Sequence, residues 1–490
     1  MEPTEEYLKK IDTVIQAGPY IDTWESLAEH PTAEWYRQAR FGFFIHWGVY
    51  SVPAYITEWY PRFMYHRQNP IRWHHLRRYG KDFNYHDFIP QFTAERFDAD
   101  KWLSILKDCS ADFIMPVAEH HDGFKMYRSE LNRWNATEMG PKRDVLGELN
   151  MACQKCGVLL AASSHRAEHY WFMNGGATLG EPNATQLAEY RDFYGPCATA
   201  DGKNGLASLI CGDRGIVPTR AWLEDWLTSS CEIVDRYHPS AFYFDSWASS
   251  EWFRPYMRKF LAYYFNRAAQ RGQEVVTFCK WDGIPYPIGI YVRERGQIEG
   301  ISPTLWQCET STSRTAWCYV ENGRYKSAHE LLCNMIDVWS KNGRMVLNIG
   351  PRADGSICNE EMRLLRTIGA WLRKNREAIW GTGPYKVFGE GKKQKAAAFK
   401  ENYHYTAHDF RFTYRLGHLY AFALVPQGET VFRIRQVAPR AGACNAIVRS
   451  ASILGEKIRV TPRQTAKYLE LTLDRPAEGE LPICFKLDLE

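Results

Sequence analysis

The chain has 490 residues, more than one ordinary domain holds, so a large domain with a smaller one is expected. Its 61 basic and 57 acidic residues leave a net charge of +4, which gives no reason to expect a nucleic acid or a membrane surface as partner. Aromatic residues make up 14% of the chain, which suits a cleft that stacks flat ligands or sugar faces as well as a bulky core.

The 13 cysteines are odd in number and scattered, and the CxxC pair of Cys153 and Cys156 has no second pair, which argues against zinc. The N-terminus shows neither the basic region nor the apolar run of a signal peptide, and no stretch of about 18 apolar residues occurs. We therefore predict a reduced, soluble, cytoplasmic protein. The sequence leaves a homo-oligomer open.

Short apolar runs recur along the chain and are typical of strands covered on both faces. They lie at residues 41–48, 113–118, 157–162, 241–244, 274–279, around 294–301, 305–309 and 344–350. Segments with helical periodicity separate them, at residues 94–109, 144–156, 185–193, 221–237, 252–270 and 329–341. This alternation predicts a (β/α)8-like (TIM) barrel. A doubly wound open sheet is the alternative, and the lack of a GxGxxG or Walker-type loop counts against a nucleotide-binding version.

A turn cluster at residues 381–384 follows a last helical segment at 360–378 and marks a boundary. Beyond it, short alternating strands predict an all-β sandwich. We thus predict a catalytic barrel with an N-terminal helical extension over residues 1–384 and a β-sandwich domain over residues 385–490. We favour a bracing role for the second domain, because nothing in it reads as a site.

Polar and aromatic side chains follow the predicted strands in one consistent way. They are His46, Glu58, Trp59, His120, His121, His165, Asp245, Trp247, Glu294, Glu299 and Glu309. They should converge, because the carboxyl ends of parallel barrel strands meet on one face. Sugar hydroxyls need such donors and acceptors, and glycoside hydrolysis needs two carboxylates. Asp245, at the end of a buried run, is the first catalytic candidate, with capping of the next helix as the alternative.

A metal site is the other interpretation of the histidines. A barrel metal site commonly starts from an HxH pair, whereas neighbours such as His120 and His121 point to opposite sides of a strand. We therefore predict neither a metal nor a cofactor. No GxSxG motif for a serine nucleophile occurs.

Four motifs follow one another through the barrel region. They are ARFGFFIHWGVYSVPA at 39–54 with EWY at 58–60, HHDGF at 120–124, AFYFDSW at 241–247, and NIGPRADG at 348–355. Together they resemble the α-L-fucosidases of glycoside hydrolase family 29, over roughly residues 33–385. The resemblance implies a (β/α)8-like barrel followed by a β-sandwich, and the hydrolysis of terminal α-L-fucosyl residues of glycosides or glycans.

The resemblance makes Asp245 the catalytic nucleophile and Glu294 the acid/base, with Glu299 second and Glu309 third for that role. The residues that it implies bind substrate are His46, Glu58, Trp59, His120, His121, His165, Trp247 and Lys280. The histidine in SSHRAEH at 163–169 departs from a Tyr-Ser pattern common in the family. The lysine in KWDG at 280–283 stands where many members have arginine, and lysine lacks the guanidinium fork.

The resemblance further implies an exo-acting enzyme that works by double displacement with retention. Its two carboxyl groups should then lie about 5–5.5 Å apart. Asp245 should be ionised, and Glu294 should be held protonated by an apolar or like-charged setting. The alternatives are another retaining glycosidase, such as a galactosidase, and a non-catalytic carbohydrate-binding protein that lacks a second carboxylate facing Asp245.

Overall fold

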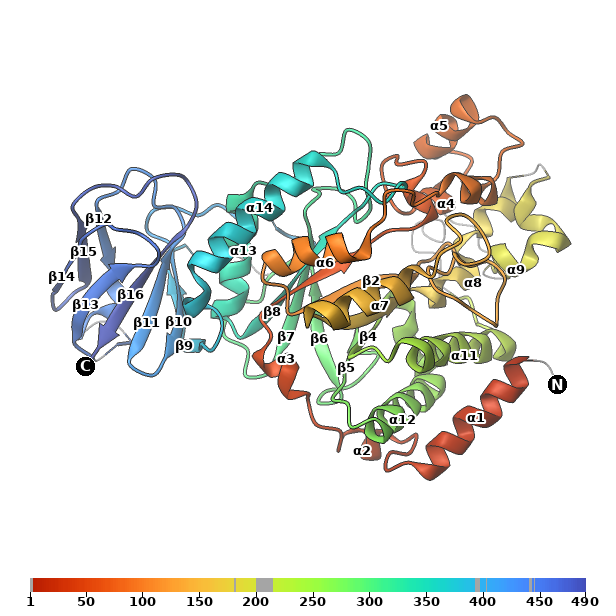
Figure 1. The fold of residues 1–490 in the computed structure, drawn as a ribbon, viewed down its shortest axis with the longest axis horizontal. Helices are drawn as coiled ribbons and strands as arrows, with labels where there is room; N and C mark the ends of the chain where they lie inside the picture. The colour runs from red at the N-terminus through yellow and green to blue at the C-terminus, as the bar shows by residue number, and fades with distance from the viewer. Residues whose placement is uncertain are drawn as a thin grey trace.

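The computed structural model describes residues 3–179, 182–199, 215–392, 397–401, 403–439, 443–444 and 446–490. Eight parallel strands form a closed barrel in chain order at the centre of the molecule (Figure 1). They are β1 (Phe41–Ile45), β2 (Phe113–Glu119), β3 (Leu159–Ser164), β4 (Ala241–Phe244), β5 (Val276–Cys279), β6 (Gly289–Glu294), β7 (Trp306–Ser311) and β8 (Gly343–Ile349). The barrel closes where β1 pairs with both β2 and β8. The predicted barrel fold is confirmed.

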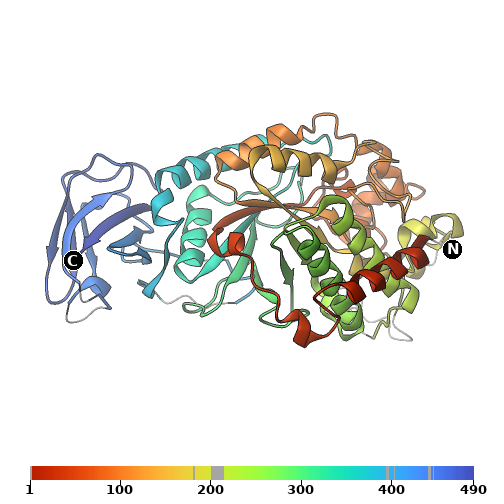
Figure 2. The same ribbon diagram turned by 60° about the horizontal axis from the view of Figure 1, so that its bottom comes forward.

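Helices surround the barrel, because the strands are apolar on their outer face as well as inside. Those in the described part of the chain are α1 (Pro3–Ala17), α2 (Trp24–Leu27), α3 (Glu34–Gln38), α4 (Tyr60–Phe63), α5 (Pro70–Arg78), α6 (Ala99–Asp108), α7 (Val145–Cys156), α8 (His169–Phe172), α9 (Arg191–Tyr194), α11 (Arg220–Tyr237), α12 (Arg254–Gln270), α13 (Ala328–Ser340) and α14 (Asn359–Lys374). The N-terminal helix α1 packs on α11 and α12 (Figure 2). Among these helices, none is long and apolar enough to cross a membrane.

The connections from β5 to β6 and from β6 to β7 are described throughout and contain no helix. On this side of the barrel, Tyr291 of β6 is 44% exposed. Strand β6 is buried at Gly289, Ile290 and Val292, exposed at Tyr291 and half-buried at its last two residues, so its apolar part is only four residues long and ends in charged residues. The strand predicted around residues 294–301 is wrong for that reason: it lies at Gly289–Glu294, and Glu294 is its last residue.

The predicted helix at residues 185–193 is also wrong. The segment forms short 3-10 turns followed by α9. Phe193 is buried and Tyr190 packs against the core, but Leu187 is 45% exposed, so the segment has no continuous apolar face of the kind a helix would bury. A short helix without such a face is not stable on its own.

The C-terminal part forms two antiparallel sheets around a core of its own, at one end of the molecule (Figure 1). One sheet has the order β13 (Val448–Ile453), β16 (Ile483–Leu489), β11 (His418–Ala423), β10 (Phe410–Arg415) and β9 (Gly383–Glu390). The other has the order β12 (Val431–Ile434), β15 (Leu469–Leu473) and β14 (Val460–Gln464). The domain boundary after residue 384 stays a prediction, and β9 begins at Gly383.

Candidate active site

Asp245 directly follows β4 and is 8% exposed. It precedes a 3-10 turn at Ser246–Ser249, but its side chain makes no capping hydrogen bond to that turn. The carboxylate instead has Lys280 Nζ at 2.6 Å, His165 Nδ1 at 3.2 Å and His121 Nε2 at 3.3 Å. The helix-capping alternative is therefore wrong, because the side chain faces the barrel mouth.

A pocket of about 270 Å³ opens at this point. The predicted residues that line it are His46, Glu58, Trp59, His120, His121, His165, Asp245, Lys280, Glu294 and Glu309. Its volume lies just below the range of roughly 300–1,000 Å³ of small-molecule sites, which suits one sugar ring. The ends of seven strands, β1 to β7, and their loops therefore converge as predicted.

Two of the predicted residues lie elsewhere. Trp247 is buried behind Asp245, where its ring packs against Tyr170 at 5.9 Å and Phe253 at 5.4 Å. The structure does not support the expected role of Trp247 in binding substrate, because its ring packs in the helical layer and does not line the pocket. Glu299 is exposed in the β6–β7 connection and does not line the pocket.

Lys280 holds Asp245 and Glu294 together. Its Nζ lies 2.6 Å from Asp245 Oδ1 and 2.8 Å from Glu294 Oε2. These two oxygens are therefore no farther apart than the sum of the two distances. That limit agrees with the separation of about 5–5.5 Å in retaining glycosidases and excludes the roughly 6.5–9.5 Å of inverting ones for this pair of oxygens.

The ionisation of Asp245 follows from its neighbours. Burial alone would raise its pKa, but the Lys280 cation, His165 and His121 hold the pKa well below its ordinary value. The pKa of Lys280 rises well above its ordinary value despite burial, because Asp245 and Glu294 flank the ammonium group. Asp245 is therefore a carboxylate at neutral pH, as a nucleophile requires.

Glu309 lines the same pocket from β7. It accepts hydrogen bonds from Tyr243 Oη at 3.0 Å and Gln307 Nε2 at 2.9 Å. Burial raises its pKa to about 7, although nearby Lys280 opposes this. The Cα atoms of Glu309 and Glu294 are register partners on β7 and β6, but Glu309 is 1% exposed, whereas the side chain of Glu294 is 13% exposed. Glu309 is therefore the more buried of the two glutamates.

Three histidines present neutral rings to the pocket. Burial lowers the pKa of His46 and of His120 well below the ordinary value, and that of His165 to about 4. His46 is oriented by a contact of 2.7 Å between its Nδ1 and Oδ1 of Asn348, from the predicted NIGPRADG motif. His121 differs: despite burial, Glu168 and Asp245 raise its pKa.

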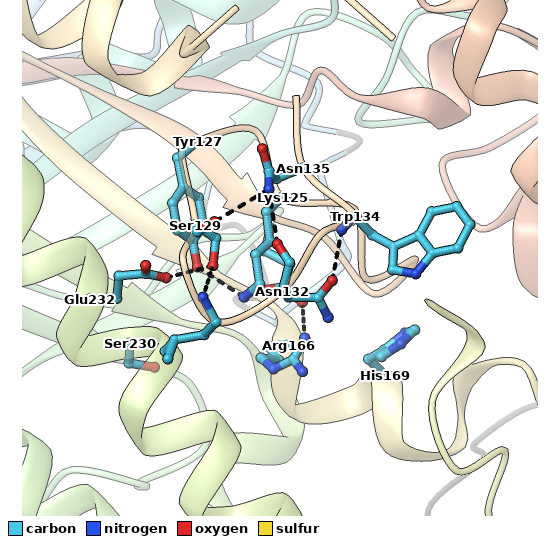
Figure 3. A network of polar contacts seen from close by, with 12 residues as sticks. Lys125, Tyr127, Ser129, Asn132, Trp134, Asn135, Arg166, His169, Ser230 and Glu232 are labelled. Carbon is cyan, nitrogen blue, oxygen red and sulfur yellow. Dashed lines mark hydrogen bonds and ion pairs between the residues drawn. The ribbon is translucent and has the colours of Figure 1, made fainter. Parts of the chain in front are cut away.

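A buried ion network lies at the ends of β2 and β3, and Figure 3 shows its members Lys125, Tyr127 and Arg166. Lys125 Nζ donates to Glu119 at 2.8 Å and to Tyr127 Oη at 2.9 Å, and Arg166 forms an ion pair with Glu119. Burial raises the pKa of Glu119, but Arg166 and Lys125 outweigh it and hold the pKa below the ordinary value. Glu119 immediately precedes His120, so the network fixes where the two adjacent histidines begin.

The sequence predicted no metal site, because adjacent histidines on a strand point to opposite sides. That argument does not apply here. β2 ends at Glu119, so His120 and His121 lie beyond the strand and both line the pocket, with ring centroids 4.3 Å apart. The donor atoms of His46, His120 and His165 come within 4.8 Å of one another, and so do those of His121, His165 and Asp245. The first set offers three nitrogen ligands and the second offers two nitrogens and a carboxylate, all of which zinc accepts. The absence of a metal stays a prediction.

Comparisons with known proteins agree with this geometry. The family model described as alpha-L-fucosidase matches residues 8–377. The chain belongs to the α-L-fucosidase family. It is 29% identical to the tissue alpha-L-fucosidase of Rattus norvegicus over 388 residues, which cover 76% of this chain and 75% of the relative. It is 28% identical to the tissue alpha-L-fucosidase of Homo sapiens over 399 residues, which cover 78% of this chain and 77% of that relative.

Solved structures of α-L-fucosidases share the fold. The alpha-fucosidase of Thermotoga maritima in complex with fucose matches with a TM-score of 0.73 and 24% identity, covering 96% of this chain and all of that one. The alpha-L-fucosidase isoenzyme 1 of Paenibacillus thiaminolyticus matches with a TM-score of 0.65 and 20% identity, and the match covers 93% of this chain and 98% of that one. At this identity the likeness supports the architecture of barrel and C-terminal sheets.

In this family member, sequence reasoning missed several residues of the pocket. They are Phe44, Glu168, Tyr243, Ser246, Trp317 and Phe399. The backbone N–H of Trp317 donates to Glu58 Oε2 at 2.9 Å, and its ring lies 5.3 Å from that of His46. Alternation along the AFYFD run could have placed Tyr243 on the same face as Asp245. No sequence signal links Phe399, which follows the barrel by some length of chain, to this pocket.

Proposed function

We propose that this member of the family is a retaining, exo-acting α-L-fucosidase in which Asp245 is the nucleophile and Glu294 the acid/base. The observation that supports it best is the pair of carboxylates joined through Lys280 in a pocket of one-sugar size. The second carboxylate also speaks against a non-catalytic carbohydrate-binding protein. The substrates are α-L-fucosides, free or on glycans, and the cytoplasmic location stays a prediction.

The pocket suits a neutral deoxysugar. His46 and His120, uncharged at neutral pH, offer ring nitrogens to hydroxyl groups, and Glu58 offers a carboxylate. Trp59 presents a flat apolar face. These groups hold the sugar with its anomeric carbon toward Asp245.

The first displacement breaks the glycosidic bond. Asp245 attacks the anomeric carbon, a bond forms from its carboxylate oxygen to that carbon, and Glu294 gives its proton to the departing oxygen. The setting of Glu294 differs from the apolar or like-charged one expected of the acid, because the Lys280 cation contacts it at 2.8 Å. Once Asp245 is esterified its charge is gone, and Lys280 then stabilises the Glu294 carboxylate.

The second displacement reverses these roles. Glu294 takes a proton from water, the hydroxide oxygen bonds to the anomeric carbon, and the ester bond to Asp245 breaks. Fucose leaves with its original anomeric configuration. Glu309 is 1% exposed and accepts hydrogen bonds from Tyr243 and Gln307, so we assign it a supporting role beside Lys280.

The test is the Asp245→Gly variant on an aryl α-L-fucoside. We expect kcat/KM to fall by roughly 10³–10⁶-fold, as for other nucleophile deletions, with partial recovery by azide and a glycosyl azide as product. Glu294→Gln should lose more activity on alkyl than on aryl fucosides, because an aryl leaving group needs less protonation. Glu299→Gln is the control. Because Glu299 is an exposed glutamate outside the pocket, this variant should behave as wild type. Unchanged turnover in Asp245→Gly would remove Asp245 from the mechanism.

A further inference from the structure

A short segment of the C-terminal part lies across the barrel mouth. It comprises residues 397–401, between β9 and β10, and we call it the clip. The Phe399 N–H donates to the backbone oxygen of Glu294 at 3.2 Å. Glu401 accepts a hydrogen bond from Thr310 of β7 and forms an ion pair of 2.6 Å with Lys326. The clip is therefore fastened at both β6 and β7.

The barrel has a glycine where the clip comes nearest. A Cβ atom at Gly296 would lie 2.1 Å from the backbone oxygen of Ala397, closer than real Cβ contacts come. The oxygen is a backbone atom and the Cβ is fixed to the backbone, so neither atom can rotate out of the way. Any side chain at Gly296 would therefore push the clip outward. The same connection contains Gly300, around which an added Cβ would meet nothing within 4 Å.

The clip puts one aromatic side chain at the pocket. Phe399 lines the pocket together with Glu294 and Lys280, yet 61% of it is exposed. Its φ of 56° is in the left-handed region, which bulky residues rarely adopt. Strain of this kind persists only where surrounding contacts enforce it, and it clusters at functional sites. The hydrogen bonds and the ion pair that fasten the clip to the barrel hold Phe399 in this conformation.

We infer that Phe399 forms the leaving-group subsite, where it stacks on a flat apolar aglycone such as an aryl ring or the apolar face of the next sugar. This inference rests on the proposed function. The histidines and Asp245 occupy the inner part of the pocket, so the fucosyl ring takes that part. The departing oxygen must face Glu294, and Phe399 is tied to the backbone of Glu294 on the mouth side. The C-terminal domain thereby selects among fucosides by their aglycone, in addition to the bracing role expected for it.

Binding of ligands that cannot turn over tests this without depending on catalysis. The probes are phenyl and methyl 1-thio-α-L-fucosides and free L-fucose, with dissociation constants from calorimetry. We expect the wild type to bind the phenyl compound more tightly than the methyl compound, and Phe399→Ala to lose roughly tenfold of that preference. The affinity for L-fucose should change less than twofold.

Gly296→Ala gives a second route to the same result. It leaves Phe399 in place but displaces the clip, so it should also reduce the phenyl preference, whereas the matched Gly300→Ala variant should retain it. A phenyl-to-methyl ratio that Phe399→Ala leaves unchanged overturns the inference, and so does an equal loss of affinity for all three ligands. Failure of the proposed function appears separately, as a wild type that binds these ligands but hydrolyses no fucoside.

Discussion

Two buried clusters of three charges invite comparison. In the pocket cluster, the Lys280 cation lies between the carboxylates of Asp245 and Glu294, whose side chains are 10% and 13% exposed. In the interface cluster, the Asp337 carboxylate of α13 lies between Lys341 and Arg411, which come from the barrel and from β10. The interface side chains are at most 4% exposed.

The clusters differ in what their charges face. Lys341 Nζ also donates to the backbone oxygen of Ile298 at 2.8 Å, and Arg411 donates to that of Phe410 at 2.9 Å. Protein groups therefore surround the interface cluster, and its charges hold the sheet domain on the barrel. The pocket cluster faces open volume instead. Buried charge alone does not mark an active site; buried charge beside a ligand-sized space does.

The largest effect should come from breaking the interface cluster. Asp337→Ala leaves two buried cations without their carboxylate, which costs about 3–5 kcal/mol of folding free energy. Thermal unfolding should show a clear loss of stability, while kcat/KM of the folded protein stays near wild type. Asp100→Ala, which removes an exposed ion pair with Lys155, is the control and should cost less than about 1 kcal/mol. A loss in Asp337→Ala no larger than in the control would refute the structural role.

A smaller effect, and one on catalysis, should come from the pocket cluster. Lys280→Met brings the carboxylates of Asp245 and Glu294 face to face, so kcat/KM should fall by roughly 10²–10³-fold. The pKa of Asp245, held low by Lys280 in the wild type, should rise. The acid limb of the kcat/KM profile should therefore move to higher pH.

The Lys280→Arg variant separates charge from shape. It keeps a cation beside Asp245, so the acid limb should return toward its wild-type position even if the longer side chain lowers the rate. An acid limb that stays in place in Lys280→Met would show that Asp245 does not depend on this cation. Arginine is also the residue that the family resemblance led us to expect here.

The same comparison shows how far the sequence could go. Asp245 was predictable because an apolar run ends at it, and the barrel because such runs alternate with helical segments. Strand β6 was predicted too far along the chain, around residues 294–301, because its apolar part spans only residues 289–292 and no helix in the adjoining connections covers it. Phe399 was not predictable at all, since its position depends on how a second domain docks. Local patterns report strands and their ends, while contacts between domains leave no local pattern.

The smallest effect is a change of folding stability with pH, and it again distinguishes the pocket from the interface cluster. Burial raises the pKa of Glu309 in the pocket to about 7 from an ordinary 4.5, whereas Arg411 and Lys341 outweigh burial and lower that of Asp337. Between pH 4.5 and 7 the folded protein holds a proton on Glu309 that the unfolded chain has released. Its stabilisation is thus fully present below pH 4.5 and is lost as the pH rises through 7.

Glu309→Gln imitates the protonated form at every pH. The stability of the variant should fall less steeply than that of the wild type between pH 5 and 7, by at most about 1.4 kcal/mol per pH unit. Urea unfolding at intervals across that range measures the difference, and Glu299→Gln should keep the wild-type slope because Glu299 is exposed. Asp337 should act in the opposite direction, because a lowered pKa gives stability that is lost as the pH falls. Equal slopes in wild type and Glu309→Gln would mean that Glu309 is already ionised in the folded protein.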